Sequence, residues 1–309
     1  MSNVRSINPW LVGLVALAGA LAGVASAAGI FLRGDLATTS FTTVRGDVVA
    51  SLTGGIYRFN GESIAAEGIG WDLVTLLLVV PALFLSLLSL RRGIPRAVLF
   101  ATGVLAYFLY QYAEYAMALA YGPLFLLYVA TFAISLSGIA LLVGELDLRE
   151  LAAGTDGRFP RRGVTAFGIF MAVLLVGMWL PLVARSFGAA QVPELNGGTT
   201  LVVQAFDLGF LVPLGIFTAL TAWRRMPVGF VLASIVVVKG AAMGAAIAAM
   251  LIVEAIVTDV VQPVPIAVFA AISLVAIGLG LRVFGSLGSL PHLAGAPTTG
   301  SMAHRTAHS

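Results

Sequence analysis

The sequence predicts an all-α, multi-pass membrane protein, and three observations carry this prediction. Hydrophobic residues make up 60% of the 309 residues and charged residues 10%, with a mean hydropathy of +1.03, whereas soluble domains are only about 45–50% apolar. Apolar runs of about 17–25 residues, long enough to cross a bilayer as a helix, recur along the chain. The arginines gather on alternate connections between these runs, which is the positive-inside pattern.

We expect about eight transmembrane helices in a single helix-bundle domain that covers residues 1–284. Glycine, proline and arginine mark several boundaries, as in Arg91-Arg92-Gly93-Ile94-Pro95, because glycine and proline stop a helix and arginine suits its C-terminal end. The expected helices are Trp10–Leu32, Leu73–Leu90, Ala97–Ala118, Leu124–Val143, Val164–Ala184, Leu201–Ala222, Val228–Val253 and Pro265–Phe284.

The arginine distribution predicts the orientation of the bundle. With the N-terminus in the cytoplasm, the connections on the cytoplasmic side carry twelve arginines and those on the outer side carry four. Positive residues are retained on the cytoplasmic side of membrane proteins. The N-terminus is therefore expected in the cytoplasm. The net charge of +3 and the pI of about 9.5 reflect this pattern, and we expect a lipid bilayer as partner and no nucleic acid.

The first apolar run has two interpretations. One arginine, an apolar stretch and Ala25-Ser26-Ala27 resemble a cleaved signal peptide covering residues 1–27. Apolarity continues past that site through Gly29-Ile30-Phe31-Leu32, and Gly19 and Gly23 form a small-xxx-small packing face. We favour a retained helix. N-terminal sequencing separates the two interpretations.

Two segments lie outside the expected helices. Residues 33–72 form an extracytoplasmic loop, in which Gly55–Ile64 alternates apolar and polar residues around Asn60-Gly61. Asn-Gly favours a type I′ turn, so we expect a small β-hairpin there. The tail, residues 285–309, is rich in Gly, Ser, Thr, Ala and Pro and is expected to be a disordered cytoplasmic tail.

Several kinds of chemistry are excluded or made unlikely by composition. The chain has no cysteine, which removes thiolate metal sites and disulfides. Its three histidines all lie in the tail, so helical haem and zinc sites have no ligands. A Walker A loop needs Gly-Lys-Ser/Thr, which is absent. We therefore expect no metal and no cofactor, and the balance is against an enzyme.

Lys239 is the only lysine and lies inside the apolar run Val228–Val253. An ammonium group at the centre of a membrane helix costs about 2.5–3.5 kcal/mol on insertion scales, so it usually faces a partner or a water-filled cavity. The other sixteen basic residues are arginines. Lysine is able to lose its proton when desolvated and arginine is not, which favours a titrating role for Lys239.

Other polar residues are expected in the outer half of the membrane. Glu114 and Asp207 lie within apolar runs, and Asp72 and Glu254 lie at the outer ends of two others. Helical spacing places these side chains on shared inward faces. The candidate polar or transport site consists of Lys239, Asp207, Glu114, Gln111, Gln204 and Tyr107.

A structural interpretation of the same residues remains open. Asp207 and Lys239 then form a buried ion pair that fixes helix packing. Tyr112, Tyr115 and Tyr121 are expected to form an aromatic belt at the outer surface. Gly240 and Gly244 form a GxxxG pair that allows a neighbouring helix to approach closely.

Pro81 and Pro213 each interrupt an apolar helix, which permits a kink. Kinks occur in transporters and in inert bundles. We find no internal repeat between the halves of the sequence, which weakens the case for an inverted-repeat transporter.

Three segments carry a resemblance to known proteins. They are YAEYAMALAYGPLFLLYVATFAISLS from Tyr112 to Ser137, VQAFDLGFLVP from Val203 to Pro213, and Lys239–Gly244. In these segments the chain resembles a loose group of prokaryotic multi-pass integral membrane proteins that have no assigned activity. The resemblance implies the fold and a location in the prokaryotic plasma membrane, and it implies no activity.

Three functions are weighed on this basis. The first is a small-solute or proton-coupled transporter, or a channel-like protein, whose polar site lies in the outer half of the bundle. The second is a non-transporting accessory or sensor protein that uses the 33–72 loop, with Asp207 and Lys239 as a structural ion pair. The third is an aldehyde-binding protein with a Schiff base on Lys239; eight helices and the absence of a retinal-pocket motif count against it.

Overall fold

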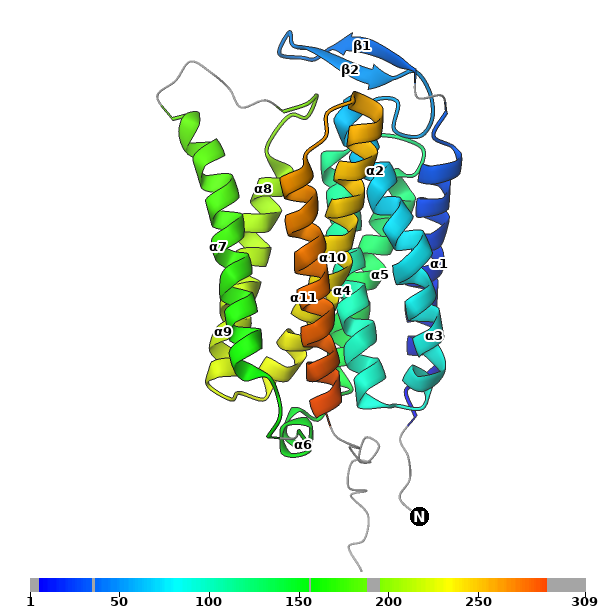
Figure 1. Cartoon of the computed structure of the whole chain (residues 1–309). Coiled ribbons are helices and arrows are strands. Elements are labelled where there is room, and N and C mark those ends of the chain that lie inside the picture. The colour runs from blue at the N-terminus through cyan, green and yellow to red at the C-terminus, as the bar shows by residue number, and fades with distance from the viewer. Residues whose placement is uncertain (1–5, 35–36, 156, 188–194, 288–309) are drawn as a thin grey trace, which may run out of the picture.

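The computed structural model describes residues 6–34, 37–155, 157–187 and 195–287. It shows a bundle of long helices with one two-stranded sheet at one end, called here the hairpin end (Figure 1). The predicted all-α fold with a small sheet is confirmed. The predicted tail lies almost wholly outside the described residues, and its first two residues, Gly285 and Ser286, still belong to the last helix.

The first half of the chain contains one long N-terminal helix, a bent helix in three parts and two further long helices. The bent helix contains a five-residue π-helical turn, η1, between two α-helical parts. These elements are α1 (Pro9–Phe31), α2 (Glu62–Val74), η1 (Thr75–Val79), α3 (Val80–Arg91), α4 (Pro95–Ala118) and α5 (Phe125–Gly144).

The second half follows a short connecting helix, α6 (Leu148–Ala153), and has the same order of elements. A long helix comes first, then a bent helix with its own π-helical turn, then two long helices. They are α7 (Arg161–Arg185), α8 (Val202–Phe206), η2 (Asp207–Leu211), α9 (Val212–Trp223), α10 (Val228–Thr258) and α11 (Pro263–Ser286).

Seven helical segments of the described chain are long and apolar enough to cross a membrane, as expected of a multi-pass membrane protein. They are α1, α2–η1–α3, α5, α7, α8–η2–α9, α10 and α11. The predicted helix Ala97–Ala118 corresponds to α4, which is 24 residues long and is not among these seven. Tyrosine, glutamine and glutamate make α4 less apolar than the others. Most of α4 is buried at the centre of the bundle, where polar side chains have protein neighbours.

The loop that we predicted for residues 33–72 is shorter than expected. We expected it to run to residue 72, but α2 begins at Glu62 and continues without a break into η1. The sequence prediction began the helix only after Asp72, at Leu73, where the apolar run starts. In the structure Asp72 is buried against other helices, so the helix continues past it.

The β-hairpin is present, but not at the predicted residues. Strand β1 (Thr38–Thr42) pairs antiparallel with β2 (Val48–Leu52). The turn between them contains Gly46 with φ +90°, a conformation that favours glycine. Asn60-Gly61, the predicted turn, instead precedes α2, with Gly61 as its N-cap residue. The type I′ turn predicted for Asn60-Gly61 is therefore wrong, and neither residue has a positive φ.

The two halves repeat each other in element order, which the sequence analysis did not detect. Both π-helical turns precede a proline by the same number of residues, and both bent helices have an arginine as C-cap residue, followed three residues later by a proline. Thr75, Pro81, Arg92, Pro95 and Tyr107 are followed at the same interval of 132 residues by Asp207, Pro213, Arg224, Pro227 and Lys239. Few residues are identical at this interval, so sequence similarity alone is weak.

The π-helical turns have a local cause. Pro81 and Pro213 are the second residues of α3 and α9. A proline inside a helix has no N–H to donate, and its ring clashes with the carbonyl group one turn earlier. Widening that turn relieves the clash, and such π-turns are frequent at functional sites. Asp207 is the first residue of η2, as Thr75 is of η1.

The helix α10 joins the halves. It packs extensively on α2 and α4 of the first half and on α9 and α11 of the second (Figure 1). Glycines allow the closest approaches. A Cβ atom at Gly70 would meet the backbone of Met250, and one at Gly244 would meet the backbone of Phe269 and Ser273. The predicted small-residue packing face on α10 is thus a contact with α11.

The outer helices of the two halves differ in their packing. In the first half α1 packs on α5, whereas in the second half α7 packs closely on α9 and makes few contacts with α11. Gly168 and Gly215 face each other at the α7–α9 crossing, with a Cβ atom at residue 168 only 2.5 Å from the Gly215 carbonyl oxygen. The helices α7 and α11 are therefore less closely packed on each other than α1 and α5 are.

This crossing yields a first prediction. Replacing Gly168 by valine forces α7 away from α9 and should destabilise the folded protein by about 1–3 kcal/mol, the usual cost of overpacking. Gly177→Val on the same helix is the matched control, because nothing lies within 4 Å of a Cβ atom there. Thermal unfolding of the detergent-solubilised variants measures the difference; equal midpoints for the two variants would contradict the close crossing.

Candidate functional site

Three of the polar residues predicted from the sequence, Lys239, Asp207 and Glu114, interact with one another, whereas Tyr107 and Gln111 meet at Thr75. Gln204, on α8, is only half-buried and has no hydrogen bond among the described residues. The other five candidates are buried: Lys239, Asp207, Glu114, Gln111 and Tyr107.

Asp207 accepts hydrogen bonds on both carboxylate oxygens. The Tyr110 hydroxyl of α4 donates to Oδ1 at 2.5 Å, and the Trp179 indole N–H of α7 donates to Oδ2 at 2.7 Å. Two donors suit an ionised carboxylate, which only accepts. Asp207 thereby links three elements, α4, α7 and η2.

Lys239 lies against the same tyrosine. Its Nζ is 3.8 Å from the centroid of the Tyr110 ring, within the range of a cation–π contact. Among the described residues, no carboxylate oxygen lies within 4.0 Å of Nζ. Within the described chain the direct ion pair expected between Lys239 and Asp207 is therefore absent, and the Tyr110 hydroxyl and the Trp179 indole bind the carboxylate instead.

Two carboxyl groups act on the Lys239 ammonium electrostatically, Asp207 and Glu114. Glu114 lies one helical turn after Tyr110 on α4 and is buried, and its Oε1 has no hydrogen-bond partner. The site therefore holds one basic side chain, Lys239, and two acidic ones, Asp207 and Glu114. Tyr110 contacts both Lys239 and Asp207.

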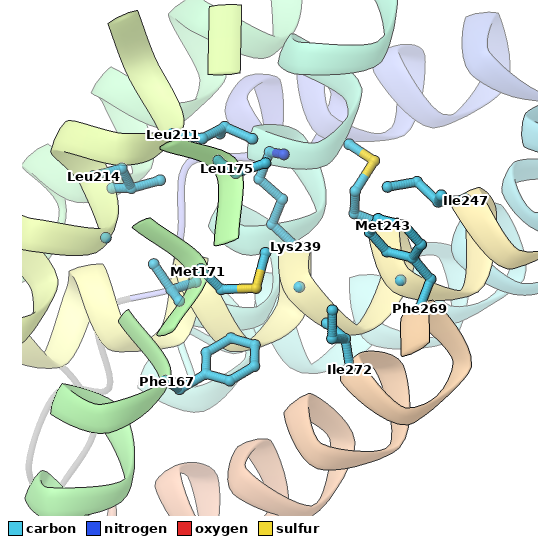
Figure 2. A pocket seen from close by; sticks show the side chains of 14 residues that line it. Phe167, Met171, Leu175, Leu211, Leu214, Lys239, Met243, Ile247, Phe269 and Ile272 are labelled. Carbon is cyan, nitrogen blue, oxygen red and sulfur yellow. The ribbon is translucent and has the colours of Figure 1, made fainter. Parts of the chain in front are cut away.

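A partly open cavity of about 60 Å³ adjoins Lys239 (Figure 2). Its walls come from α7, η2, α9, α10 and α11, and include Met171, Leu175, Leu214 and Met243. Every lining residue apart from Lys239 is apolar. The Lys239 side chain thus borders a space that has no other polar side chain in its lining.

The first half has neutral groups at the positions that correspond to Asp207 and Lys239. Thr75 Oγ1 lies 2.8 Å from the Tyr107 hydroxyl and 2.9 Å from Gln111 Oε1. These hydrogen bonds close the space between η1 and α4. The charged residues of the second half therefore occupy the positions of a closed, neutral contact in the first.

A second acid is buried in the first half, with tyrosines around it. Tyr57 donates to Asp72 Oδ2 at 2.5 Å, and the Tyr115 hydroxyl is 3.4 Å from Oδ1. Tyr112 lies 3.4 Å from the Ser26 hydroxyl of α1. The predicted tyrosine belt is thus wrong for Tyr112 and Tyr115, which are buried, while Tyr121 is exposed.

The polar groups continue toward the hairpin end. Glu67 of α2 and Glu254 of α10 interact electrostatically with each other, and Glu67 also acts on Glu114. Gln262 donates to Glu254 at 3.2 Å. Acidic groups therefore extend from the end of α10 to the Lys239 site. No group of three His, Cys, Asp or Glu residues in the described chain is arranged to hold a metal ion.

Sequence reasoning missed Tyr110 and Trp179, which hold Asp207. Both are aromatic residues in apolar helices, where packing or an interfacial location is the usual explanation. Tyr110 precedes Glu114 by four residues and so shares its face of α4, a signal that was available. Trp179 gives no such signal, because its contact depends on how α7 packs.

The Tyr110 hydroxyl gives a second prediction. Tyr110→Phe keeps the ring under Lys239 and removes one donor from the buried Asp207 carboxylate, which should destabilise the protein by about 1–3 kcal/mol. Tyr121→Phe is the control, because the Tyr121 side chain is 81% exposed. Thermal unfolding compares the two; an unchanged midpoint for Tyr110→Phe would show that the hydroxyl does not hold Asp207.

A third prediction concerns Tyr57, which lies before α2. Burial, and then the nearby Asp72, raise the pKa of Tyr57 well above its ordinary value. Since the unfolded chain releases this proton near pH 10 and the folded protein does not, this contribution to stability is lost as the pH rises above about 10. In a spectrophotometric titration, Tyr57→Phe should therefore leave the tyrosinate absorbance of the folded protein unchanged. A decrease equal to one tyrosine would contradict the burial of this hydroxyl.

Comparison with known proteins adds no family to this description. No protein-family model, curated protein or solved structure matches the chain significantly. The function is therefore argued from the geometry of the site around Lys239.

Proposed function

We propose that the protein is a proton-coupled transporter of a small solute in a prokaryotic plasma membrane, with its N-terminus in the cytoplasm. The solute site is the cluster of Lys239, Asp207, Glu114 and Tyr110 beside the cavity. The observation that carries the proposal is the arrangement of Lys239, a buried ammonium that borders a cavity and lacks a direct carboxylate partner.

The contacts of Lys239 favour the binding and release of a solute or proton over a purely structural role. A buried pair that only fixes packing gains most when its charges are in contact and its hydrogen bonds are complete. Here Asp207 is held by Tyr110 and Trp179, and Lys239 has only the ring face of Tyr110. The ammonium is thus free to accept a solute or to release a proton without breaking an ion pair.

Proton movement has a route in the same geometry. Glu67, Glu114 and Glu254 lie between the hairpin end and Lys239, and interact with their neighbours electrostatically. Trp71 Nε1, Gln111 Nε2 and Glu114 Oε1 are buried without a hydrogen-bond partner among the described residues. Since buried polar groups are normally satisfied by protein or ordered water, these atoms are contact points for water along such a route.

The repeated architecture supports the same function. Transporters are often built from two repeats, with their sites next to discontinuous helices. Each half of this chain has a helix interrupted by a π-helical turn, and Asp207 begins the turn in the second half. The contacts of α1 with α3 and α5 support a retained first helix.

A fourth prediction tests the proposal. Proteoliposomes are screened by solid-supported-membrane electrophysiology with sugars, amino acids, amines and monocarboxylates. We expect one class to give a pH-dependent current that falls at least about tenfold in Lys239→Arg and Asp207→Asn, because arginine keeps the charge but does not release its proton.

Val44→Ser at the exposed hairpin tip is the control and should keep the current. Size-exclusion elution and thermal unfolding establish that each variant is folded. The proposal fails if no class gives a current above that of empty liposomes, or if Lys239→Arg retains the full current.

A further inference from the structure

The cavity beside Lys239 has a single polar group. In Figure 2 the lysine side chain lies among apolar side chains from α7, η2, α10 and α11. Its ammonium has three donors and no acceptor. A molecule that enters this cavity therefore satisfies Lys239 only if it brings an acceptor, and it satisfies the rest of the lining only if it is apolar.

The lysine is available for such a molecule. Lys239 is 6% exposed, and its only described polar contact is with the Tyr110 ring. Both oxygens of Asp207 are taken by Tyr110 and Trp179. An ammonium buried without an oxygen acceptor is costly, so an anionic acceptor that reaches Nζ is strongly favoured.

The packing of the surrounding helices indicates how a bound molecule would reach the cavity. On one side of the cavity α7 is closed on α9 by the Gly168–Gly215 crossing, and on the other α10 is closed on α11 by Gly244. The helices α7 and α11 make few contacts with each other. A chain that leaves the cavity would therefore pass between α7 and α11, two surrounding helices with little mutual contact.

We propose that this cavity binds the head of an amphipathic monocarboxylate, whose carboxylate lies on Lys239 Nζ and whose hydrocarbon chain leaves between α7 and α11 into the bilayer. This inference rests on the proposed function, because it names the solute class of the same site.

Charge and size favour a carboxylate over other polar head groups. Asp207 and Glu114 already act on Lys239, so a dianionic phosphate would meet two acids and only one cation. A sugar would need several polar partners, and the lining offers one. The cavity volume of about 60 Å³ exceeds the ~10–15 Å³ that one water needs, but it is too small for a whole lipid head group with its chain.

The test is equilibrium binding of radiolabelled dodecanoate to the full chain in lipid nanodiscs at neutral pH. We expect saturable binding of the label, which unlabelled dodecanoate displaces and dodecanol does not. Lys239→Gln should weaken it at least tenfold, because the anion loses its cation. Lys239→Arg should retain most of the binding, since its charge remains.

A second pair of variants tests the location. Leu175→Trp fills the cavity from α7 and should weaken binding at least tenfold. Leu180→Trp, on the exposed face of the same helix, is the matched control and should bind as the parent does. Met171→Phe fills the same cavity with a smaller change of volume and replaces Leu175→Trp if that variant does not fold.

Three results would overturn the inference: no saturable binding, equal displacement by dodecanol, or full binding in Lys239→Gln. None of them alone removes the proposed function, which is tested by Lys239-dependent current with any solute class. Conversely, Lys239-dependent binding of dodecanoate without any current would leave the binding site intact and refute transport.

Discussion

The structure depends on one constraint, which is that a charged group inside an apolar bundle needs partners from other helices. The helix α4 supplies most of them. Its Tyr110 donates to Asp207 with its hydroxyl and receives the Lys239 ammonium on its ring. Because α4 carries this polar face, it is less apolar than its neighbours and occupies the centre of the bundle, where α10 covers it. The lipid-facing helices surround this pair.

The two halves meet the same constraint in different ways. In the first half, Thr75, Tyr107 and Gln111 satisfy one another, and α1 packs on α5. In the second half the corresponding positions hold Asp207 and Lys239, and α7 stands away from α11. At these corresponding positions one repeat thus has neutral, hydrogen-bonded groups, while the other has charged groups beside a cavity. This asymmetry places the candidate site where Asp207 and Lys239 of the second half meet Tyr110 of α4.

Much of this arrangement could be predicted from residue patterns, and its errors have physical causes. Helical spacing placed Tyr107, Gln111 and Glu114 on one buried face, since all three belong to one helix. The partners of Asp207 were predicted wrongly because opposite charge favoured Lys239, whereas packing brings Tyr110 and Trp179 closer. The hairpin was misplaced because an Asn-Gly turn and a helix N-cap have similar local signals.

The sequence by itself determined the class of the protein, the approximate extent of its helices and the presence of buried ionisable residues. These are local properties, set by the length of each apolar run and by the residues that interrupt it. Only the tertiary structure decided that the halves repeat, that Lys239 lies on Tyr110 rather than on Asp207, and that a cavity opens beside it. These features depend on the rotation and spacing of helices that are distant in the chain, such as α4 and α10, which no local pattern specifies.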